Sequence, residues 1–377
     1  MASAAFFRAS TFLRSSSHYQ WYWNCKSNDE KEDEWVKYAD IDNEIIEDAY
    51  NEQKDEVEID GDITINLKQQ VQYRKVDQSE QRTIKRVLLE ERIGRKVHLR
   101  EGRFSQTIPV STTPSNDGRQ DLPTGVGMRI MRTGFFSGGY ELSELRSKKK
   151  TIADVVQEAA EGILKEGIGI GKRCQAQHLA QQLIAVKHYG ENIYVTYFKD
   201  GQCPSEIGNI FVNIYTKDSF WYKLLNGVLR HPERASYDQL KTLGPFCFLL
   251  HNYLKKISTN HILRVYRGLL LTTDEERQSF MNKHMNFLSF TSTTANRGLA
   301  EIYGNTLLIM DLDTKLQPMQ DCQVGASIAH LSNFPEEEEY LLWTGAYFSF
   351  VRYEYDNRTS KHILYLKSSE ANNNLFS

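Results

Sequence analysis

The chain reads Ile262-Leu-Arg-Val-Tyr-Arg-Gly268, later Phe287-Leu-Ser-Phe-Thr-Ser-Thr-Thr294, and later still Glu336-Glu-Glu-Glu-Tyr-Leu-Leu-Trp-Thr344. Alternation of apolar and polar residues with a period of two is typical of half-buried strands. From His261 onward the candidate strands are Ile262–Tyr266, Phe287–Thr293, Thr306–Leu312, Tyr340–Tyr355 and Ile363–Leu366. Loops rich in Asn, Asp and Gly separate them. The C-terminal part is therefore expected to be a β-sandwich without internal repeats.

A helical layer is expected before these strands. Apolar residues keep a period of 3.6 from Ile152 to Ile163, and again in Ala176–His188 and Phe220–Leu229. Three glycines, Gly167, Gly169 and Gly171, suggest a phosphate loop at first sight. No apolar strand precedes them and their spacing to Lys172 misses the P-loop pattern, so they indicate a helix stop. The fold class is therefore α+β.

The first third of the chain indicates a separate small domain. Residues 19–103 alternate in a strand-like way around one amphipathic helix at Asp42–Gln53, which predicts a small sheet with a packed helix. Residues 104–150 hold three of the eight prolines, many small polar residues and the basic run Arg146–Lys150, and are expected to form a flexible linker. The second domain is expected at residues 151–370, with an N-terminal extension at 1–18 and a polar tail at 371–377.

Composition narrows the class of protein. A net charge of -3 gives no overall reason to expect nucleic acid as a partner. Five cysteines without a CxxC pair disfavour a disulfide framework and a zinc site, so no metal is expected. No apolar run approaches the roughly 20 residues of a membrane span. We therefore expect an intracellular protein, cytoplasmic or nuclear, although residues 1–18 resemble a mitochondrial transit peptide.

Two side chains on the strands are candidates for binding an anion and a sugar. Arg267 shares a strand face with Leu263 and Val265, and a guanidinium among apolar residues calls for an anion such as a diphosphate. Gly268 behind it permits close backbone approach. Alternatively, the stem of Arg267 packs and its head reaches water. Ser292 lacks the surroundings of a nucleophile, so its role would be hydrogen bonding, or it is an ordinary strand residue.

The acidic run from Glu336 to Glu339 leads directly into a strand. In an extended chain Glu337 and Glu339 point to one side, with the carboxylates roughly 7 Å apart. Two carboxylates so placed suit chemistry at a sugar carbon, where positive charge develops in the transition state and a nucleophile must be oriented. The ordinary alternative is a solvated acidic loop.

In this order, Tyr266-Arg-Gly, Phe290-Thr-Ser-Thr-Thr and Ile328-Ala-His-Leu-Ser-Asn-Phe-Pro-Glu-Glu-Glu-Glu-Tyr-Leu resemble the Arg-Ser-Glu class of mono-ADP-ribosyltransferases. The resemblance covers about residues 152–369 and implies NAD or NADP as co-substrate. It makes Arg267, with Gly268, the ligand of the diphosphate and Ser292 the hydroxyl that orders the nicotinamide ribose. It makes Glu339 the essential glutamate. Glu337 matches the extra glutamate of members that modify arginine.

The first third resembles a WWE domain, through Tyr19-Gln-Trp-Tyr-Trp23, Glu34-Trp-Val-Lys-Tyr38, Ile45-Ile-Glu-Asp-Ala-Tyr50, Val71-Gln-Tyr-Arg-Lys75 and Arg82-Thr-Ile-Lys-Arg86. The two tryptophans and the glutamate of the name correspond to Trp23, Trp35 and Glu47. Such domains commonly bind the iso-ADP-ribose unit of poly-ADP-ribose. The matching contact positions are Tyr22, Gln72 and Arg82, while Ile63 replaces a tyrosine of binding members. The alternative is that the tryptophans are only core residues.

Together these resemblances imply an enzyme that moves ADP-ribose from NAD to arginine side chains of acceptor proteins, with a reader that brings it to poly-ADP-ribosylated partners. Two other hypotheses remain. One is an NAD glycohydrolase, in which water is the acceptor. The other is a catalytically inert adaptor that binds poly-ADP-ribose.

Overall fold

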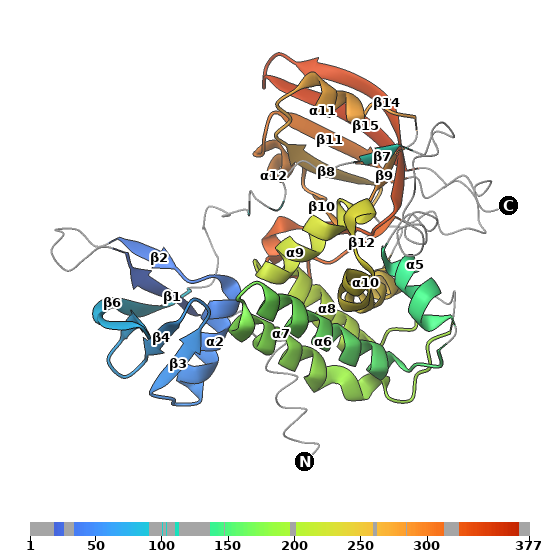
Figure 1. The fold of residues 1–377 in the computed structure, drawn as a ribbon. Helices are drawn as coiled ribbons and strands as arrows, with labels where there is room; N and C mark the ends of the chain where they lie inside the picture. The colour runs from blue at the N-terminus through green and yellow to red at the C-terminus, as the bar shows by residue number, and fades with distance from the viewer. Residues whose placement is uncertain are drawn as a thin grey trace.

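The computed structural model describes residues 19–25, 34–89, 100, 103, 110–112, 136–146, 148–196, 201–258, 262–283, 285–312 and 324–368. These residues form a small N-terminal module, a helical lobe and a large sheet (Figure 1). The α+β class is confirmed. The extension expected at residues 1–18 and the tail expected at residues 371–377 lie outside the described residues.

The N-terminal module is a six-stranded sheet with the order β2-β1-β6-β5-β4-β3 and one helix. Its elements are β1 (Tyr19–Asn24), β2 (Trp35–Lys37), α2 (Asp40–Asn51), β3 (Glu56–Ile59), β4 (Ile63–Asn66), β5 (Val71–Arg74) and β6 (Asp77–Leu88). The helix therefore begins and ends two residues before its expected bounds. The core of the module is made by Trp21, Tyr38, Ile46, Ile59, Ile65 and Ile84.

The expected linker contains ordered elements, which corrects the prediction of a flexible segment over residues 104–150. Strand β7 (Val110–Thr112) pairs with β9 (Met285–Phe287) of the large sheet. Helix α5 (Phe136–Tyr140) and the π-helix η1 (Glu141–Leu145) belong to the helical lobe. The rings of Phe136 and Tyr140 are buried in its core, and such burial stabilises the segment. Composition indicated a linker because a count of residue types over the whole segment gives little weight to two aromatic residues. These two, Phe136 and Tyr140, hold the segment against the helical lobe.

The helical lobe contains α6 (Ile152–Gly169), α7 (Arg173–Val186), η2 (Lys187–Gly190), α8 (Ser205–Thr216), α9 (Phe220–Leu229), η3 (Pro232–Arg234) and α10 (Tyr237–Ile257). Helix α6 starts with a capping box, because Thr151 Oγ1 accepts from the Asp154 amide at 3.1 Å and Asp154 Oδ2 accepts from the Thr151 amide at 2.8 Å. It ends within the glycine run, where Gly171 has a φ of +72°. The expected helix stop is confirmed.

The large sheet has nine strands in the order β12-β13-β10-β8-β11-β15-β14-β9-β7. Its remaining elements are β8 (Arg264–Leu269), α11 (Asp274–Ser279), β10 (Thr291–Thr294), α12 (Arg297–Glu301), β11 (Thr306–Asp311), β12 (Gly325–Ser327), η4 (Pro335–Glu337), β13 (Glu339–Leu342), β14 (Ala346–Asp356) and β15 (Lys361–Ser368). The strands of the expected sandwich thus form one hydrogen-bonded sheet. Within this sheet, β10 pairs with β8 through one pair of residues, Thr294 and Tyr266.

Two expected strands are each split in the structure. The predicted Phe287–Thr293 contains the end of β9 and most of β10, and the predicted Tyr340–Tyr355 contains β13 and β14. Gly345, with a φ of +84°, makes the turn between β13 and β14, a conformation that favours glycine. The split matters for the site because β13 pairs with β10, whereas β14 pairs with β15.

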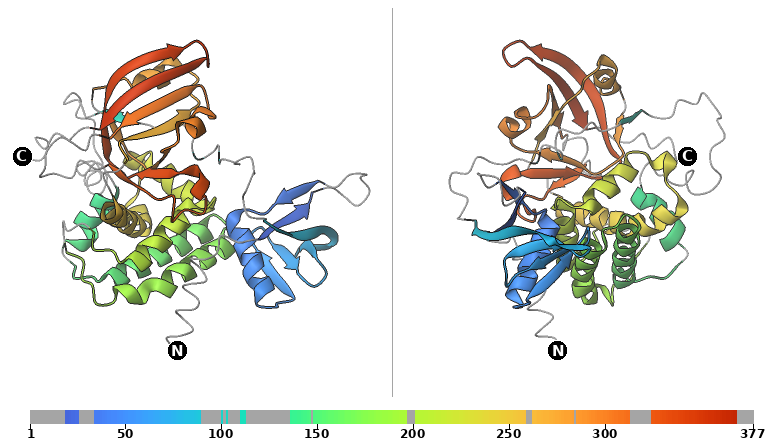
Figure 2. Two further views of the ribbon diagram at one scale, coloured as in Figure 1. Left: turned by 180° about the vertical axis from the view of Figure 1, so that it is seen from behind. Right: turned by 60° about the vertical axis from the view of Figure 1, so that its left-hand side comes forward.

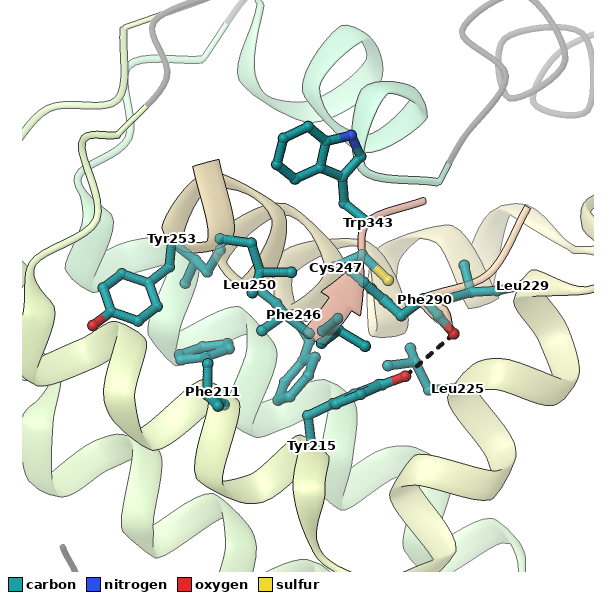
Figure 3. Close-up of a cluster of buried hydrophobic side chains, with 14 of the residues drawn as sticks. Phe211, Tyr215, Leu225, Leu229, Phe246, Cys247, Leu250, Tyr253, Phe290 and Trp343 are labelled. Carbon is teal, nitrogen blue, oxygen red and sulfur yellow. Dashed lines mark hydrogen bonds between the residues drawn. The ribbon is translucent and has the colours of Figure 1, made fainter. Parts of the chain in front are cut away.

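Aromatic side chains join the helical lobe to the sheet (Figure 3). Phe211, Tyr215 and Phe246 come from α8 and α10, and Phe290 and Trp343 come from segments beside β10 and β13. The Tyr215 hydroxyl donates to the Phe290 carbonyl oxygen at 3.4 Å. This core fixes the end of α8 against the strands that carry Ser292 and Glu339. In the described part of the chain, none of the helices has the length and apolar character that crossing a membrane requires.

The N-terminal module packs on the helical lobe through α2, which faces α7 (Figure 2). The buried Glu44 accepts from Lys217 Nζ at 2.8 Å and lies 3.0 Å from His178 Nε2. Burial opposes ionisation of Glu44, but Lys217 and His178 outweigh it and lower its pKa to about 2. Asp60 accepts from the first amides of α7, those of Cys174 and Gln175, at 2.7 and 3.0 Å. The two parts therefore meet at a charged and hydrogen-bonded interface.

Candidate active site

Arg267 is buried on β8. Its Nη1 donates to the Ser292 carbonyl oxygen at 2.6 Å, which ties β8 to β10. Burial is the main cause that lowers the pKa of Arg267 to about 10, and the neighbouring guanidiniums of Arg230 and Arg103 contribute to this shift. A buried guanidinium beside two others is a strong site for an anion, because a diphosphate would neutralise charges that now repel each other. The exposed alternative expected for Arg267 is excluded.

Gly268 has a packing reason to be glycine. A Cβ at this position would lie 2.2 Å from the Ala300 carbonyl oxygen and 2.7 Å from that of Tyr303. The close backbone approach expected at Gly268 is therefore an approach of the protein's own chain around α12. This contact holds β8, and with it Arg267, against the helix that follows β10.

Ser292 is buried in the middle of β10, directly opposite Leu341 of β13. The same register places Thr294 opposite Glu339, so Ser292 and Glu339 lie on one face of the strand pair. The Ser292 hydroxyl has no hydrogen-bond partner in the described part of the chain. A buried hydroxyl without a partner costs free energy, so it is suited to receive a ligand's hydrogen bond.

Burial selects two of the four consecutive glutamates. Glu337 and Glu339 are buried, whereas Glu338 is exposed. The extended geometry that was expected is wrong: Glu337 ends the 3-10 turn that begins at Pro335, and Glu338 has a left-handed φ of +46°. The strand begins only at Glu339. The two carboxylates are therefore brought inward by a turn rather than by strand alternation.

Glu339 forms an ion pair with Arg103, and both side chains are buried. Arg103 Nη2 and Nε donate to Glu339 Oε1 at 2.9 and 3.2 Å, and Nη1 donates to the Tyr215 carbonyl oxygen at 3.0 Å. Burial opposes the charge of Arg103, but Glu339, together with Tyr222, Tyr215 and Glu337, outweighs it, so the Arg103 pKa lies above its ordinary value. Glu339 Oε2 has no hydrogen-bond partner among the residues described.

Glu337 holds a second arginine, Arg100. Arg100 Nε donates to Glu337 Oε1 at 2.9 Å, Nη2 donates to Oε2, and Nη1 donates to the Thr216 carbonyl oxygen. The guanidinium carbon also lies 3.6 Å from the centre of the Phe334 ring. A carboxylate fork, a carbonyl and an aromatic face together recognise a guanidinium specifically.

Residues that the sequence did not single out complete the site. Tyr222 of α9 and Tyr215 of α8 place their rings 4.3 and 4.8 Å from the Arg103 guanidinium. Arg230 follows the last residue of α9, and its buried Nε has no partner within the described residues. Residues 68–103 contain more Arg and Lys than Asp and Glu, and this local charge is the only feature of the sequence that marks Arg100 and Arg103. Nothing in the sequence distinguishes Arg230 from other helix-end arginines.

The residues present fit NAD as a substrate. Arg267 and Arg230 offer positive charge for a diphosphate, and the partnerless Ser292 hydroxyl and Glu339 Oε2 offer hydrogen-bonding atoms for a ribose. Tyr215 and Tyr222 offer aromatic faces to a cationic ring. Within the described ranges, no cluster of three or more His, Cys, Asp or Glu residues is arranged to hold a metal ion.

The expected reader residues do not all face the same way. Gln72 of β5 lies opposite Arg82 of β6, and the Arg82 guanidinium lies 5.7 Å from the Trp23 ring. In the neighbouring pairing Tyr22 lies opposite Lys85. Because successive strand residues face opposite sides, Tyr22 points away from Gln72 and Arg82. Trp23 is therefore the aromatic residue of β1 that accompanies them.

The tryptophan bonded to Glu47 is Trp21. Its indole Nε1 donates to Glu47 Oε2 at 2.9 Å, and Arg86 Nη2 donates to Oε1 at 2.6 Å. From the sequence, the letters of the WWE name were assigned to Trp23, Trp35 and Glu47, and Trp21 was not singled out. Trp21 is fully buried against α2, whereas Trp23 is half-buried and can offer part of its ring to a ligand.

Comparisons with known proteins identify both parts of the chain. Residues 19–86 match the WWE domain, and residues 203–374 match the family described as NAD:arginine ADP-ribosyltransferase. No match was found among curated proteins.

Several solved structures resemble the chain. The ADP-ribosyltransferase HopU1 of Pseudomonas syringae is 18% identical over 44% of this chain and 77% of its own, with a TM-score of 0.37. Exoenzyme S from Pseudomonas aeruginosa, in complex with human 14-3-3 protein beta and bound to carba-NAD, is 15% identical over 57% of this chain and 88% of its own, with a TM-score of 0.37. The type III effector XopAI from Xanthomonas axonopodis is 15% identical over 56% and 88%, with a TM-score of 0.40.

The two matched regions cover the segments in which the site residues lie. Trp21, Glu47, Gln72 and Arg82 fall in the first, and Arg267, Ser292, Glu337 and Glu339 fall in the second. The chain therefore carries a WWE domain followed by a domain of the NAD:arginine ADP-ribosyltransferase family, whose activity is ADP-ribosyl transfer from NAD.

Proposed function

We propose that the acceptor of the ADP-ribose is the side chain of arginine in other proteins. The observation that carries this proposal is the contact of Arg100 with Glu337. The chain's own guanidinium is held there by a carboxylate fork, the Thr216 carbonyl oxygen and the Phe334 ring. Side chains that recognise one guanidinium from within the chain have the chemistry to recognise another from an acceptor protein.

The residues divide the reaction between binding and chemistry. Arg267, assisted by Arg230, would bind the diphosphate, and Ser292 would order the nicotinamide ribose. Glu339 would hydrogen-bond the ribose and stabilise the positive charge that develops as nicotinamide leaves. Glu337 would hold the acceptor guanidinium and take its proton as the nitrogen attacks the ribose carbon. The bond to nicotinamide breaks, the bond to the arginine nitrogen forms, and the proton passes to Glu337.

The experiment is an assay of the full chain with labelled NAD and agmatine, a small guanidine, as acceptor. The expected products are nicotinamide and ADP-ribosyl-agmatine. Propylguanidine tests for the same guanidinium without the amine, and spermidine, which has amines but no guanidinium, is the matched negative acceptor. Transfer to spermidine with none to agmatine would contradict the assignment of Glu337 as a guanidinium site.

We infer that the WWE domain binds ADP-ribose units on partner proteins through Gln72, Arg82 and Trp23. Arg82 and Gln72 lie directly opposite each other on β5 and β6, and the Trp23 ring lies beside Arg82. An arginine suits a phosphate and an indole suits an adenine. Binding of iso-ADP-ribose to the full chain, measured by calorimetry, tests this inference; no binding at millimolar ligand would contradict it.

A further inference from the structure

Two arginines of the chain itself occupy the two glutamates of the active site. Arg103 lies on Glu339 and Arg100 lies on Glu337, and the amide of Arg103 donates to the Arg100 carbonyl oxygen at 2.8 Å. Both arginines follow the WWE domain in the sequence and precede the residues that match the transferase family. We propose that Arg100 and Arg103 are an internal competitor that closes the active site: Arg103 takes the place of NAD at Glu339, and Arg100 takes the place of the acceptor at Glu337.

The contacts of Arg103 are those of a bound ligand rather than of a surface ion pair. Its guanidinium is buried, donates to Glu339 and to the Tyr215 carbonyl oxygen, and lies beside the rings of Tyr215 and Tyr222. Glu339 is the residue that must meet the nicotinamide ribose. One carboxylate oxygen, Oε1, carries both hydrogen bonds from Arg103, so among the described residues a ribose finds only Oε2 without a hydrogen bond until Arg103 leaves and can use both oxygens afterwards.

The charge balance favours displacement by NAD. Arg103 is held by Glu339. Its positive charge and that of Arg230 oppose the charge of Arg267, and both add to burial, the main cause, in lowering the pKa of Arg267. A diphosphate bound at Arg267 and Arg230 would remove that mutual repulsion among guanidiniums, while the ribose would compete for Glu339. Arg103 and NAD therefore compete for the carboxylate of Glu339. The fraction of the protein that is closed falls as the concentration of NAD rises.

The WWE domain contacts the residues that hold the closed state. Arg100 donates to the carbonyl oxygen of Thr216. The next two residues are bound by α2 of the WWE domain: Lys217 donates to Glu44 at 2.8 Å, and the Asp218 amide donates to Asp40 at 2.8 Å. The docked WWE domain therefore holds the turn after α8 in place, next to the residue that Arg100 contacts. The closed state and the domain interface therefore depend on consecutive residues of one turn, Thr216 for the first and Lys217 with Asp218 for the second.

The test measures binding of carba-NAD, an NAD analogue, to the full chain by calorimetry. Arg103→Ala should bind it at least about ten-fold more tightly than the unchanged protein, because the apparent dissociation constant falls as the open fraction rises. Arg103→Lys keeps the charge but loses the planar fork, so an intermediate gain is expected. Arg358→Ala, an exposed arginine beside the turn between β14 and β15, is the matched control and should bind as the unchanged protein does.

The outcomes separate this inference from the proposed function. If Arg103→Ala and Arg103→Lys both bind carba-NAD no more tightly than the unchanged protein, the internal competitor is contradicted even though the enzyme binds its substrate. If Arg103→Ala does not fold, Arg103→Lys decides alone. A gain in both arginine variants, with transfer to agmatine rising in parallel at low NAD, supports the inference. A gain in binding without transfer to agmatine supports closure and contradicts the arginine acceptor.

Discussion

Arg103 and Glu339 form a fully buried ion pair across more than two hundred residues of sequence, with Nη2 2.9 Å from Oε1. A buried pair of this kind costs stability when one partner alone is removed, because the other charge is left uncompensated. The pair therefore links the stability of the fold to Glu339, the residue to which we assign the chemistry.

Glu339→Gln is expected to abolish activity and also to lower the free energy of unfolding by about 3 to 5 kcal/mol. The double change of Glu339→Gln with Arg103→Met should recover much of the stability and none of the activity, because no buried charge then lacks a partner. Urea unfolding of the single and double variants provides the measurement. Equal stability of the unchanged protein and Glu339→Gln would show that the pair is not formed in solution.

Glu337→Gln should separate transfer from hydrolysis. The variant keeps Glu339 and therefore still releases nicotinamide from NAD, but it loses the carboxylate that binds the acceptor guanidinium and takes its proton. Transfer to agmatine should fall about 100-fold or more, as expected for loss of a general base, while hydrolysis of NAD to free ADP-ribose persists. The ratio of the two products is read by chromatography.

The Glu337 test also decides between the proposed enzyme and an NAD glycohydrolase. In a glycohydrolase the unchanged protein already gives free ADP-ribose as its main product with agmatine present. Identical product ratios in Glu337→Gln and the unchanged protein would show that Glu337 does not bind or deprotonate the acceptor.

Replacement of Arg82 and Tyr22 should have unequal effects on the WWE domain. Arg82→Ala removes the guanidinium beside Trp23 and opposite Gln72, and binding of iso-ADP-ribose should weaken about 10-fold or more, as for loss of one charge-assisted contact. Tyr22→Ala should change binding little, because Tyr22 points to the other face. Calorimetry on the two full-length variants gives the comparison, and a larger loss in Tyr22→Ala would place the ligand on the opposite face.

His251 predicts a pH dependence of stability. The ring is buried on α10, 5.6 Å from the Trp343 ring, and burial with the nearby Lys255 lowers its pKa from 6.5 to about 3. Between these values the unfolded chain binds a proton that the folded chain does not, so this contribution to stability is lost as the pH falls below 6.5. The loss approaches about 1.4 kcal/mol per pH unit in the middle of this range, where the unfolded chain is protonated and the folded chain is not.

His251→Phe should remove this part of the slope. Unfolding by urea at pH 7, 6 and 5 compares the variant with the unchanged protein, and the other titrating groups cancel in the difference. The unchanged protein should gain stability relative to His251→Phe as the pH rises from 5 to 7. A constant difference across the three pH values would mean that His251 is free to take up a proton in the folded state.

The sequence predicted the elements whose patterns are local. The hydrophobic period located α6, α9 and β11, and the glycine run correctly ended α6. The order of Arg267, Ser292 and the glutamates pointed to the family without any three-dimensional information. These predictions succeeded because they depended on residues that are close together in the sequence or that belong to a recognisable motif.

Long-range packing decided what the sequence did not predict. The 3-10 turn at Pro335 replaced the expected extended glutamate run, because Glu339, not Glu337, pairs with β10. Phe136 and Tyr140 ordered part of an expected linker by burial among helices far along the chain. Arg100 and Arg103 reach the site from a basic stretch that has no motif, and only the fold shows which carboxylates they meet.

The most direct test of the account is mass spectrometry of an arginine-containing acceptor peptide after incubation with NAD and the full chain. We expect one ADP-ribose on the guanidinium of arginine, formed by the unchanged protein and absent with Glu339→Gln. ADP-ribose attached to another side chain, or NAD consumed with no modified peptide, would contradict it.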